Sequence, residues 1–512
     1  MAGLTMALGA SGLAPAACEE APLSAIDWLS QGLGAPPASA LPDPESVSLP
    51  RTDLPGGKIE VTPIAQPSPE AVGLLPVSVT GLPRDLWARS DAGDLARRLA
   101  DFRPDMLPAA RRLLFVLLLA ELDPPAGEGH ETRLLLARVD ALLRFGAVEQ
   151  AQALLMRAGP RNRALVSRMF DAALLTGAED VACAEIAAAP ALAPGLAARV
   201  FCLARAGDVA AADLLLAAGR ALGELSVYED ALLARFLHPE AFEGLPPLAP
   251  PETMTPLIFR LFEAIGEPLP TANLPLAYAH ADLRPVAGWR AQIEAAERLA
   301  RAGALPANRL LGLWTERRPA ASGGIWDRVA ALQVFDAAVT DRDLGRIEAS
   351  LPPAWAQMRR AGLEPVFAEI YALPLEHLPL SGEAEQIRFT LGMLSDRYER
   401  YARARTSPPE AGDALLAAIA TGEMPDTISS PDPFATAVFK AFRARQAPAR
   451  LEGLIRSGRL GEALLRALQL VEAGADGDTA ALADGLATLR AVGLEGAARR
   501  AALEVLILER RG

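Results

Sequence analysis

Lysine, histidine, cysteine and aromatic residues are all scarce in this chain of 512 residues. Lys58 and Lys440 are the only lysines, and the chain has four histidines, three cysteines and 5% aromatic residues. No histidine has a second histidine or a cysteine at metal-ligand spacing, so a zinc site is not expected. The phosphate-binding, dinucleotide-binding, zinc-protease and nucleophile-elbow motifs are missing as well. We therefore expect a protein that is not an enzyme, with no catalytic residue, no cofactor and no metal.

Blocks of positive charge and long apolar runs are also missing. The formal net charge is −13, and the arginines are interspersed with acidic residues. A sequence-independent nucleic-acid binder needs a basic stripe that displaces counterions, so nucleic acid is not an expected partner. The longest apolar run, residues 113–119, is far shorter than the ~20 apolar residues that cross a bilayer. No integral membrane segment is predicted.

Alanine and leucine dominate the chain, and apolar residues make up 51% of it. Five times, a glycine closes one apolar helix-like run and an alanine follows five residues later in the next. These pairs are Gly146/Ala151, Gly177/Ala182, Gly207/Ala212, Gly458/Ala463 and Gly493/Ala498. The first three glycines lie 31 and 30 residues apart, and the last two lie 35 apart. This rhythm is typical of stacked helical hairpins, which cannot bury their apolar faces alone, and it predicts an all-α fold.

The pairs resemble the tetratricopeptide repeat. Its hairpin has a glycine between the helices, an alanine five residues on, another alanine seven later and a terminal proline. The residues that match are Gly146, Ala151 and Ala158, then Gly177, Ala182, Ala189 and Pro194. Gly219, Leu470 and Val505 replace the later alanine elsewhere, and the family's large aromatics are mostly missing. The resemblance covers residues 131–237 and 451–511, and it implies a right-handed α-solenoid of helical hairpins.

The chain is also similar to uncharacterised alphaproteobacterial proteins that carry an automatic label as antifreeze glycopeptide polyproteins. Such peptides need a repeated Thr-Ala-Ala tripeptide, which this chain lacks. The label therefore predicts nothing about function.

Proline and glycine divide the chain into segments. Residues 1–16 are a possible signal peptide, and residues 17–83 form a proline-rich extended arm. Residues 84–238 and 383–512 are predicted to be helical-repeat segments, separated by an irregular helical block at residues 252–375. Within the arm, residues 72–79 are expected to be a short strand or an extended segment on the helices. Residues 383–404 are predicted to form one long charged helix.

Two features bear on the cellular compartment. Residues 4–13 are weakly apolar, and Ala14-Pro15-Ala16 has the small-x-small form of a cleavage site, although no basic residue precedes them. Cys183 and Cys202 are symmetric about a proline turn, so they come level if the flanking helices form a hairpin. They are either a disulfide, which requires an oxidising compartment, or two buried thiols. We expect the periplasm or cell envelope, with the cytoplasm as the alternative.

Tryptophan marks the candidate partner-binding residues. Four of the six tryptophans fall in the irregular block, and Trp314 stands close to Arg317 and Arg318. Trp and Arg are enriched at binding hot spots, but these rings are also suited to filling gaps in the core. Trp28 lies in an amphipathic island at residues 23–33 inside the arm. That island has little core of its own, so it docks either on the helices of this chain or on a partner.

These observations predict a non-enzymatic helical-repeat scaffold that binds another protein or peptide in the bacterial cell envelope. One alternative is a superhelical cell-wall enzyme or accessory, as in soluble lytic transglycosylases. Those enzymes carry a Glu-Ser motif in a C-terminal domain, whereas the only such pair here is Glu45-Ser46, in the arm. The other alternative is a cytoplasmic tetratricopeptide-like regulator.

Overall fold

The computed structural model describes residues 68–125, 132–159, 162–404, 411–428 and 430–508. The chain divides into two units, Met1–Ile64 and Ala65–Gly512. The second unit carries all of the described residues. The possible signal peptide and most of the expected arm lie outside them.

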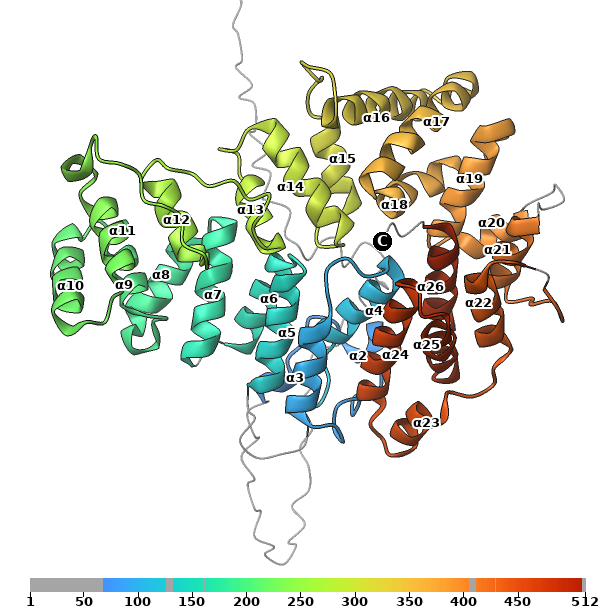
Figure 1. The fold of residues 1–512 in the computed structure, drawn as a ribbon, viewed down its shortest axis with the longest axis horizontal. Coiled ribbons are helices and arrows are strands. Elements are labelled where there is room, and N and C mark those ends of the chain that lie inside the picture. The colour runs from blue at the N-terminus through green and yellow to red at the C-terminus, as the bar shows by residue number, and fades with distance from the viewer. Residues whose placement is uncertain (1–67, 126–131, 160–161, 405–410, 429, 509–512) are drawn as a thin grey trace, which may run out of the picture. The chain divides into compact units, whose positions relative to one another are not determined.

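The described residues form 25 α-helices and no strand apart from one isolated bridge between Leu75 and Ala120 (Figure 1). The all-α prediction is confirmed. None of the helices in these ranges combines the length and the apolar character needed to cross a membrane.

The helices fall into three groups along the chain. The first group is α2 (Val77–Thr80), α3 (Ala92–Asp101), α4 (Pro108–Leu119), α5 (Arg133–Arg144), α6 (Val148–Ala158), α7 (Arg163–Thr176), α8 (Glu179–Ala188), α9 (Leu196–Arg205), α10 (Val209–Leu222) and α11 (Val227–Leu237). The second is α12 (Pro256–Ala264), α13 (Ala279–Asp282), α14 (Trp289–Arg301), α15 (Ala307–Thr315), α16 (Ile325–Thr340), α17 (Leu344–Ala361) and α18 (Glu364–Leu375). The third is α19 (Gly382–Leu394), α20 (Tyr398–Ala404), α21 (Ala411–Thr421), α22 (Pro433–Arg443), α23 (Ala449–Arg456), α24 (Leu460–Ala475), α25 (Thr479–Ala491) and α26 (Glu495–Ile507). Short 3-10 helices are η1 (Pro69–Ala71), η2 (Pro190–Leu192), η3 (Pro239–Phe242) and η4 (Leu276–Tyr278).

The five glycine–alanine pairs mark five helix-to-helix turns. Each glycine lies between two consecutive helices and has a φ between 75° and 86°, in the left-handed region that favours glycine. Each alanine lies in the helix that follows and is buried. The small side chain lets the two helices of the hairpin approach closely. The spacing therefore predicted the turns correctly.

The last helices pack against the first ones. α24 contacts α3 and α4, and α26 contacts α4, so that the red C-terminal helices lie beside the blue N-terminal ones (Figure 1). At the start of α4, Glu472 accepts a hydrogen bond from the N–H of Leu107 at 3.1 Å. Glu504 accepts one from the N–H of Ala109 at 2.7 Å. The first N–H groups of a helix have no partner within the helix, so these two side chains satisfy backbone donors of α4 and join α24 and α26 to it.

The prediction of one long helix at residues 383–404 is wrong. The segment forms two helices, α19 and α20, separated by a turn. The hydroxyl of Ser395 donates to the carbonyl of Gly392 at 2.7 Å and accepts from the N–H of Arg397 at 3.0 Å. This turn folds Tyr401 back against Gly392, where an added Cβ would lie 2.1 Å from the ring. A side chain that competes for backbone hydrogen bonds thus ends the helix, despite its charged periodic pattern.

Residues 72–75, from the end of the expected arm, lie along α4 and α5. The N–H groups of Leu74 and Leu75 donate to the carbonyl of Leu119 at 2.7 and 2.9 Å. Arg138 of α5 is 2% exposed, and its guanidinium donates to the carbonyl of Val72 at 2.8 Å and that of Leu118 at 2.7 Å. One buried arginine therefore satisfies backbone groups of both the extended segment and α4.

Most of the hydrophobic core belongs to a large cluster built from α3–α7, α13–α22 and α24–α26. A smaller cluster is built from α7 to α12. In the smaller cluster, Phe201 contacts Phe170 with ring centroids 6.2 Å apart and Phe236 with centroids 5.6 Å apart. The region from α8 to α12 thus depends on a modest core of its own.

Candidate functional site

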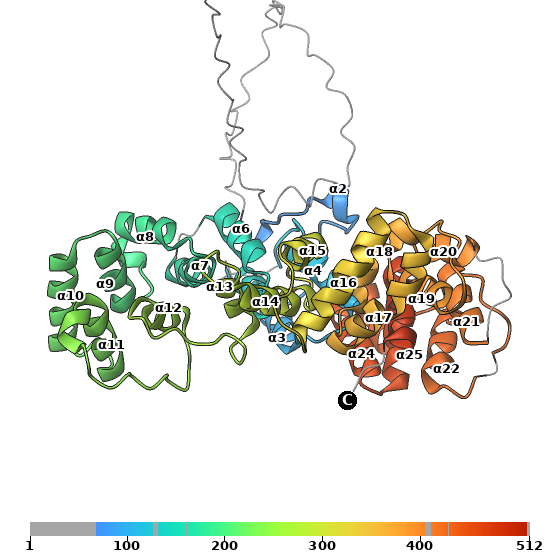
Figure 2. The same ribbon diagram turned by 90° about the horizontal axis from the view of Figure 1, so that it is seen from above.

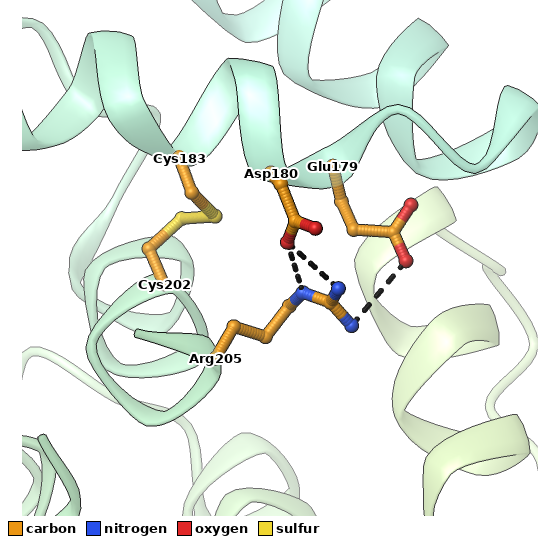
Figure 3. Close-up of a disulfide and its surroundings, with 5 residues drawn as sticks. All are labelled: Glu179, Asp180, Cys183, Cys202 and Arg205. Atoms are coloured by element: carbon orange, nitrogen blue, oxygen red, sulfur yellow. Dashed lines mark hydrogen bonds and ion pairs between the residues drawn. A yellow bond between two sulfur atoms is a disulfide. The ribbon is translucent and has the colours of Figure 1, made fainter. Parts of the chain in front are cut away.

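Cys183 of α8 and Cys202 of α9 form a disulfide (Figure 3). Their sulfur atoms are 2.03 Å apart and their Cα atoms 5.1 Å apart. Both residues are buried and belong to the smaller core cluster. The two helices are antiparallel neighbours joined by the η2 turn, so the symmetric positions of the cysteines in the sequence become opposite positions across the hairpin.

A network of ion pairs lies beside the disulfide. Arg205 of α9 donates to Asp180 at 2.7 Å and lies 3.4 Å from Glu179, both in the first turn of α8 (Figure 3). Arg260 of α12 donates to the same oxygen of Glu179, Oε1, at 2.7 Å. Glu179 is 4% exposed, so these two arginines compensate a buried carboxylate. The network joins α8, α9 and α12, and we interpret it as structural.

The structure contradicts the prediction that Trp314 binds a partner. Its side chain is 0% exposed, and its indole N–H donates to Glu297 at 3.1 Å. Glu297 is in turn held by Arg328, whose guanidinium donates to it at 2.6 Å. The ring is large and apolar and has one polar group to satisfy, so it is suited to a core that contains a buried carboxylate. Trp314 packs the protein and presents nothing to a partner.

The other predicted residues divide into two kinds. Arg317 and Arg318 are exposed beyond the end of α15, where Arg317 donates to the neighbouring Glu316 at 2.9 Å. Both remain predicted partner-binding residues. Trp28 lies outside the described residues.

An exposed apolar face on α10 is the strongest candidate for a binding surface. Leu214 and Leu222 have relative exposures of 74% and 71%. Alanines at helical spacing continue the same face and are also exposed: Ala210, Ala217, Ala218 and Ala221. α10 packs chiefly against α9 and α11, and both views show it at the outer end of this group of helices (Figures 1 and 2). We call these six residues the α10 face.

The sequence of α10 contains a signal for this face. In α10, Asp213 and Arg220 are the only polar residues, so apolar side chains cover almost the whole circumference. A helix that is apolar all round is normally buried on all sides. Here the opposite side of the helix meets the core through Ala212 and Leu216, which leaves the α10 face exposed. The face is exposed because no further helix covers that side of α10. The periodicity of a sequence does not show which helices lie next to one another.

Within the described residues, no group of three or more His, Cys, Asp or Glu side chains is placed to hold a metal ion. No protein-family model, no curated protein and no solved structure matches the chain.

Proposed function

We propose that this protein is a non-enzymatic helical-repeat scaffold of the right-handed α-solenoid type, and that it binds another protein through the α10 face. In the protein that we propose, the helices follow the proline-rich extended arm that the sequence predicts at residues 17–83. The exposed apolar surface of α10 is the observation that carries the proposal. Terminal repeats of stacked helical proteins normally need a polar outer side to stay soluble. A continuous apolar face at such a position favours an interaction surface.

The geometry suggests which kind of partner would fit. Leu214 and Leu222 are the two large side chains of the face, with small alanines between and beside them. Small residues let a second helix approach closely, and the two leucines supply anchors about two turns apart. We therefore expect the partner to present an amphipathic helix, with its apolar side packed on α10.

We further propose that the scaffold works in the periplasm or cell envelope. A disulfide between Cys183 and Cys202 supports this placement, because such bonds persist in oxidising compartments and are rare in the cytoplasm. Non-reducing electrophoresis of protein trapped with an alkylating reagent in its native cells tests the placement. Quantitative alkylation of both thiols would contradict it.

The binding proposal is tested by capturing partners with the wild-type protein and with Leu214→Glu/Leu222→Glu. The exposed positions of both leucines mean that the variant should fold normally. Val334→Glu, on the 57% exposed Val334 of α16, is the matched control outside the face. We expect a partner that the wild type and the control retain and the double variant loses. Equal retention by all three proteins would refute a role for α10.

A deletion of residues 23–33 tests the remaining sequence-based candidate, Trp28, in the same experiment. Loss of the partner from the deletion variant, with retention by Leu214→Glu/Leu222→Glu, would move the binding function from α10 to the island around Trp28.

A further inference from the structure

A cavity of about 630 Å³ lies where the beginning, middle and end of the described chain meet. Its walls come from the segment before α4 and the first turn of α4, from the end of α14, and from the junction between α17 and α18. Leu508, just after α26, completes the wall. Cavities of this size are typical of sites for small molecules.

The cavity is strongly basic, although the protein as a whole is acidic. Among the described residues, five arginines line it, from three different helices: Arg111, Arg298, Arg301, Arg359 and Arg360. Asp105 and Glu364 are the only acidic residues in this described part of the lining. The formal net charge of the chain is −13, so this local excess of positive charge opposes the general field. A concave surface lined by one sign of charge concentrates ions of the opposite sign.

Helix stability accounts for some of these arginines. Arg298 and Arg301 lie in the last turn of α14, and Arg359 and Arg360 in the last turn of α17. Cations at helix C-termini interact favourably with the helix dipole. Arg298 is also structural, because its guanidinium donates to the carbonyls of Thr271 and Leu274 at 3.0 and 3.1 Å. These four positions alone do not require a ligand.

Neither the helix dipole nor a hydrogen bond explains Arg111. It lies in the first turn of α4, at the positive end of the helix dipole, where a cation is disfavoured. Its side chain is only 7% exposed, yet it lines the cavity. Among the described residues, no hydrogen bond or ion pair holds its guanidinium. A buried cation without such a partner is costly, and Arg111 is therefore the residue that points to a missing anion.

The guanidinium of Arg111 packs closely against Gly303 and carries a positive charge. Its Nε would lie 2.8 Å from a Cβ added at Gly303, whose φ of +66° also favours glycine. Burial lowers the pKa of Arg111 to about 10, and the attraction of Glu504, Glu472 and Glu369 offsets only part of this effect. The guanidinium therefore stays protonated at neutral pH. It is a fixed positive charge on the cavity wall.

We propose that this cavity binds a small ligand that carries two negative charges, as one phosphate group or as two carboxylates, on a compact apolar body. Arg111 and Arg301 would bind the anionic group. Arginine is suited to this because its planar fork donates two parallel hydrogen bonds to a phosphate or carboxylate. The apolar body would lie against the remaining wall, which includes Met106, Leu276, Val366 and Leu508. This site is separate from the α10 face, so either proposal stands if the other fails.

The test uses the full chain and isothermal titration calorimetry at constant ionic strength. Phenyl phosphate and isophthalate are the probes for the two kinds of dianion, and phenol is the neutral control. We expect at least one dianion to bind and phenol not to bind. Arg111→Gln and Arg301→Gln should each weaken binding about tenfold, which corresponds to one lost charged hydrogen bond. Arg290→Gln removes an exposed arginine of α14 that lies outside the cavity, and it should leave affinity unchanged within about twofold.

Arg301 is exposed, so its variant keeps the test valid if Arg111→Gln fails to fold. Tighter binding of phenyl phosphate than of isophthalate identifies the natural ligand as a phosphate, and the reverse identifies a carboxylate. The proposal is overturned if neither dianion binds at concentrations of about 5 mM. It is also overturned if both cavity variants bind as well as Arg290→Gln.

Discussion

The hairpins from α5 to α10 and those from α23 to α26 share one glycine–alanine spacing but lie in different surroundings. In the C-terminal group, α26 contacts α4, α19, α21 and α22, and its core belongs to the large cluster. In the N-terminal group, α5 and α6 also belong to the large cluster, whereas α8–α10 belong to the smaller one. α10 contacts chiefly α9 and α11. The disulfide lies in the part that depends on the smaller cluster. The shared motif therefore specifies how two helices turn, while the neighbours determine how the hairpin is stabilised.

The largest expected effect concerns the close packing of the C-terminal group. A Cβ added at Gly474 of α24 would lie 2.4 Å from the Cβ of Leu482 and 2.6 Å from its Cα. Backbone atoms cannot move aside, so Gly474→Val should separate α24 from α25 and lower the free energy of unfolding by about 4 kcal/mol. Denaturant titration followed by circular dichroism measures this loss.

Gly453→Ala is the matched control for this variant. Gly453 lies within α23, and an added Cβ there meets no atom within 4 Å. Replacing a helical glycine by alanine should stabilise the protein by about 0.5–1 kcal/mol. If Gly474→Val is as well tolerated as Gly453→Ala, α24 and α25 do not pack closely at Gly474.

The disulfide should matter for the N-terminal group alone. Cys183→Ala/Cys202→Ala removes a cross-link between residues 19 apart in sequence, worth about 3 kcal/mol in chain entropy. Hydrogen exchange should accelerate in α8–α12 and stay unchanged in α24–α26, because these two sets of helices use different core clusters. Cys18→Ala removes the third cysteine and should have no effect on these rates. Equal acceleration in both groups would show that the smaller core is not an independent unit.

Glu504 provides a pH-dependent test of the contact between α26 and α4. Burial raises its pKa to about 7, although Arg112 and the N–H of Ala109 favour the ionised form. The folded protein thus binds this proton more tightly than the unfolded chain does. The resulting stability is complete below the ordinary pKa of 4.5, and it is lost as the pH rises through 7. The loss should amount to about 2–3 kcal/mol.

Glu504→Gln should remove this slope, because the amide oxygen still accepts from Ala109 but does not ionise. Thermal unfolding measured between pH 5 and 8 gives the comparison. We expect the wild type and the variant to differ in slope over this range, with the variant the more stable of the two at pH 8. Parallel curves for the two proteins would contradict the raised pKa.

Local features were predictable from the sequence, whereas long-range ones were not. The glycine turns were predicted because a left-handed residue after an apolar helix has few alternatives to glycine. The symmetry of Cys183 and Cys202 about a turn is also local, and it predicted that they lie close together, with a disulfide and two buried thiols as the alternatives. In contrast, the contacts of Glu472 and Glu504 with α4 join residues more than 360 positions apart. No periodic pattern encodes such a contact.

The candidate sites were harder to predict for the same reason. Trp314 carries an ordinary hot-spot signal, but its burial depends on Glu297 and Arg328, which come from two other helices. The five cavity arginines are scattered between residues 111 and 360 and look like ordinary surface charges in the sequence. Only their convergence on one cavity distinguishes them.

The smallest expected effect tests whether the shared motif acts alike in both groups. Gly207 and Gly493 have φ values of +83° and +86°, and an added Cβ at either meets no atom within 4 Å. Alanine should therefore cost only the backbone strain, about 1 kcal/mol at each site. The two sites lie in different core clusters, so the double variant should lose about 2 kcal/mol, additive within about 0.5 kcal/mol. A much larger loss at Gly493 would mean that the surroundings, and not only the turn, fix that glycine.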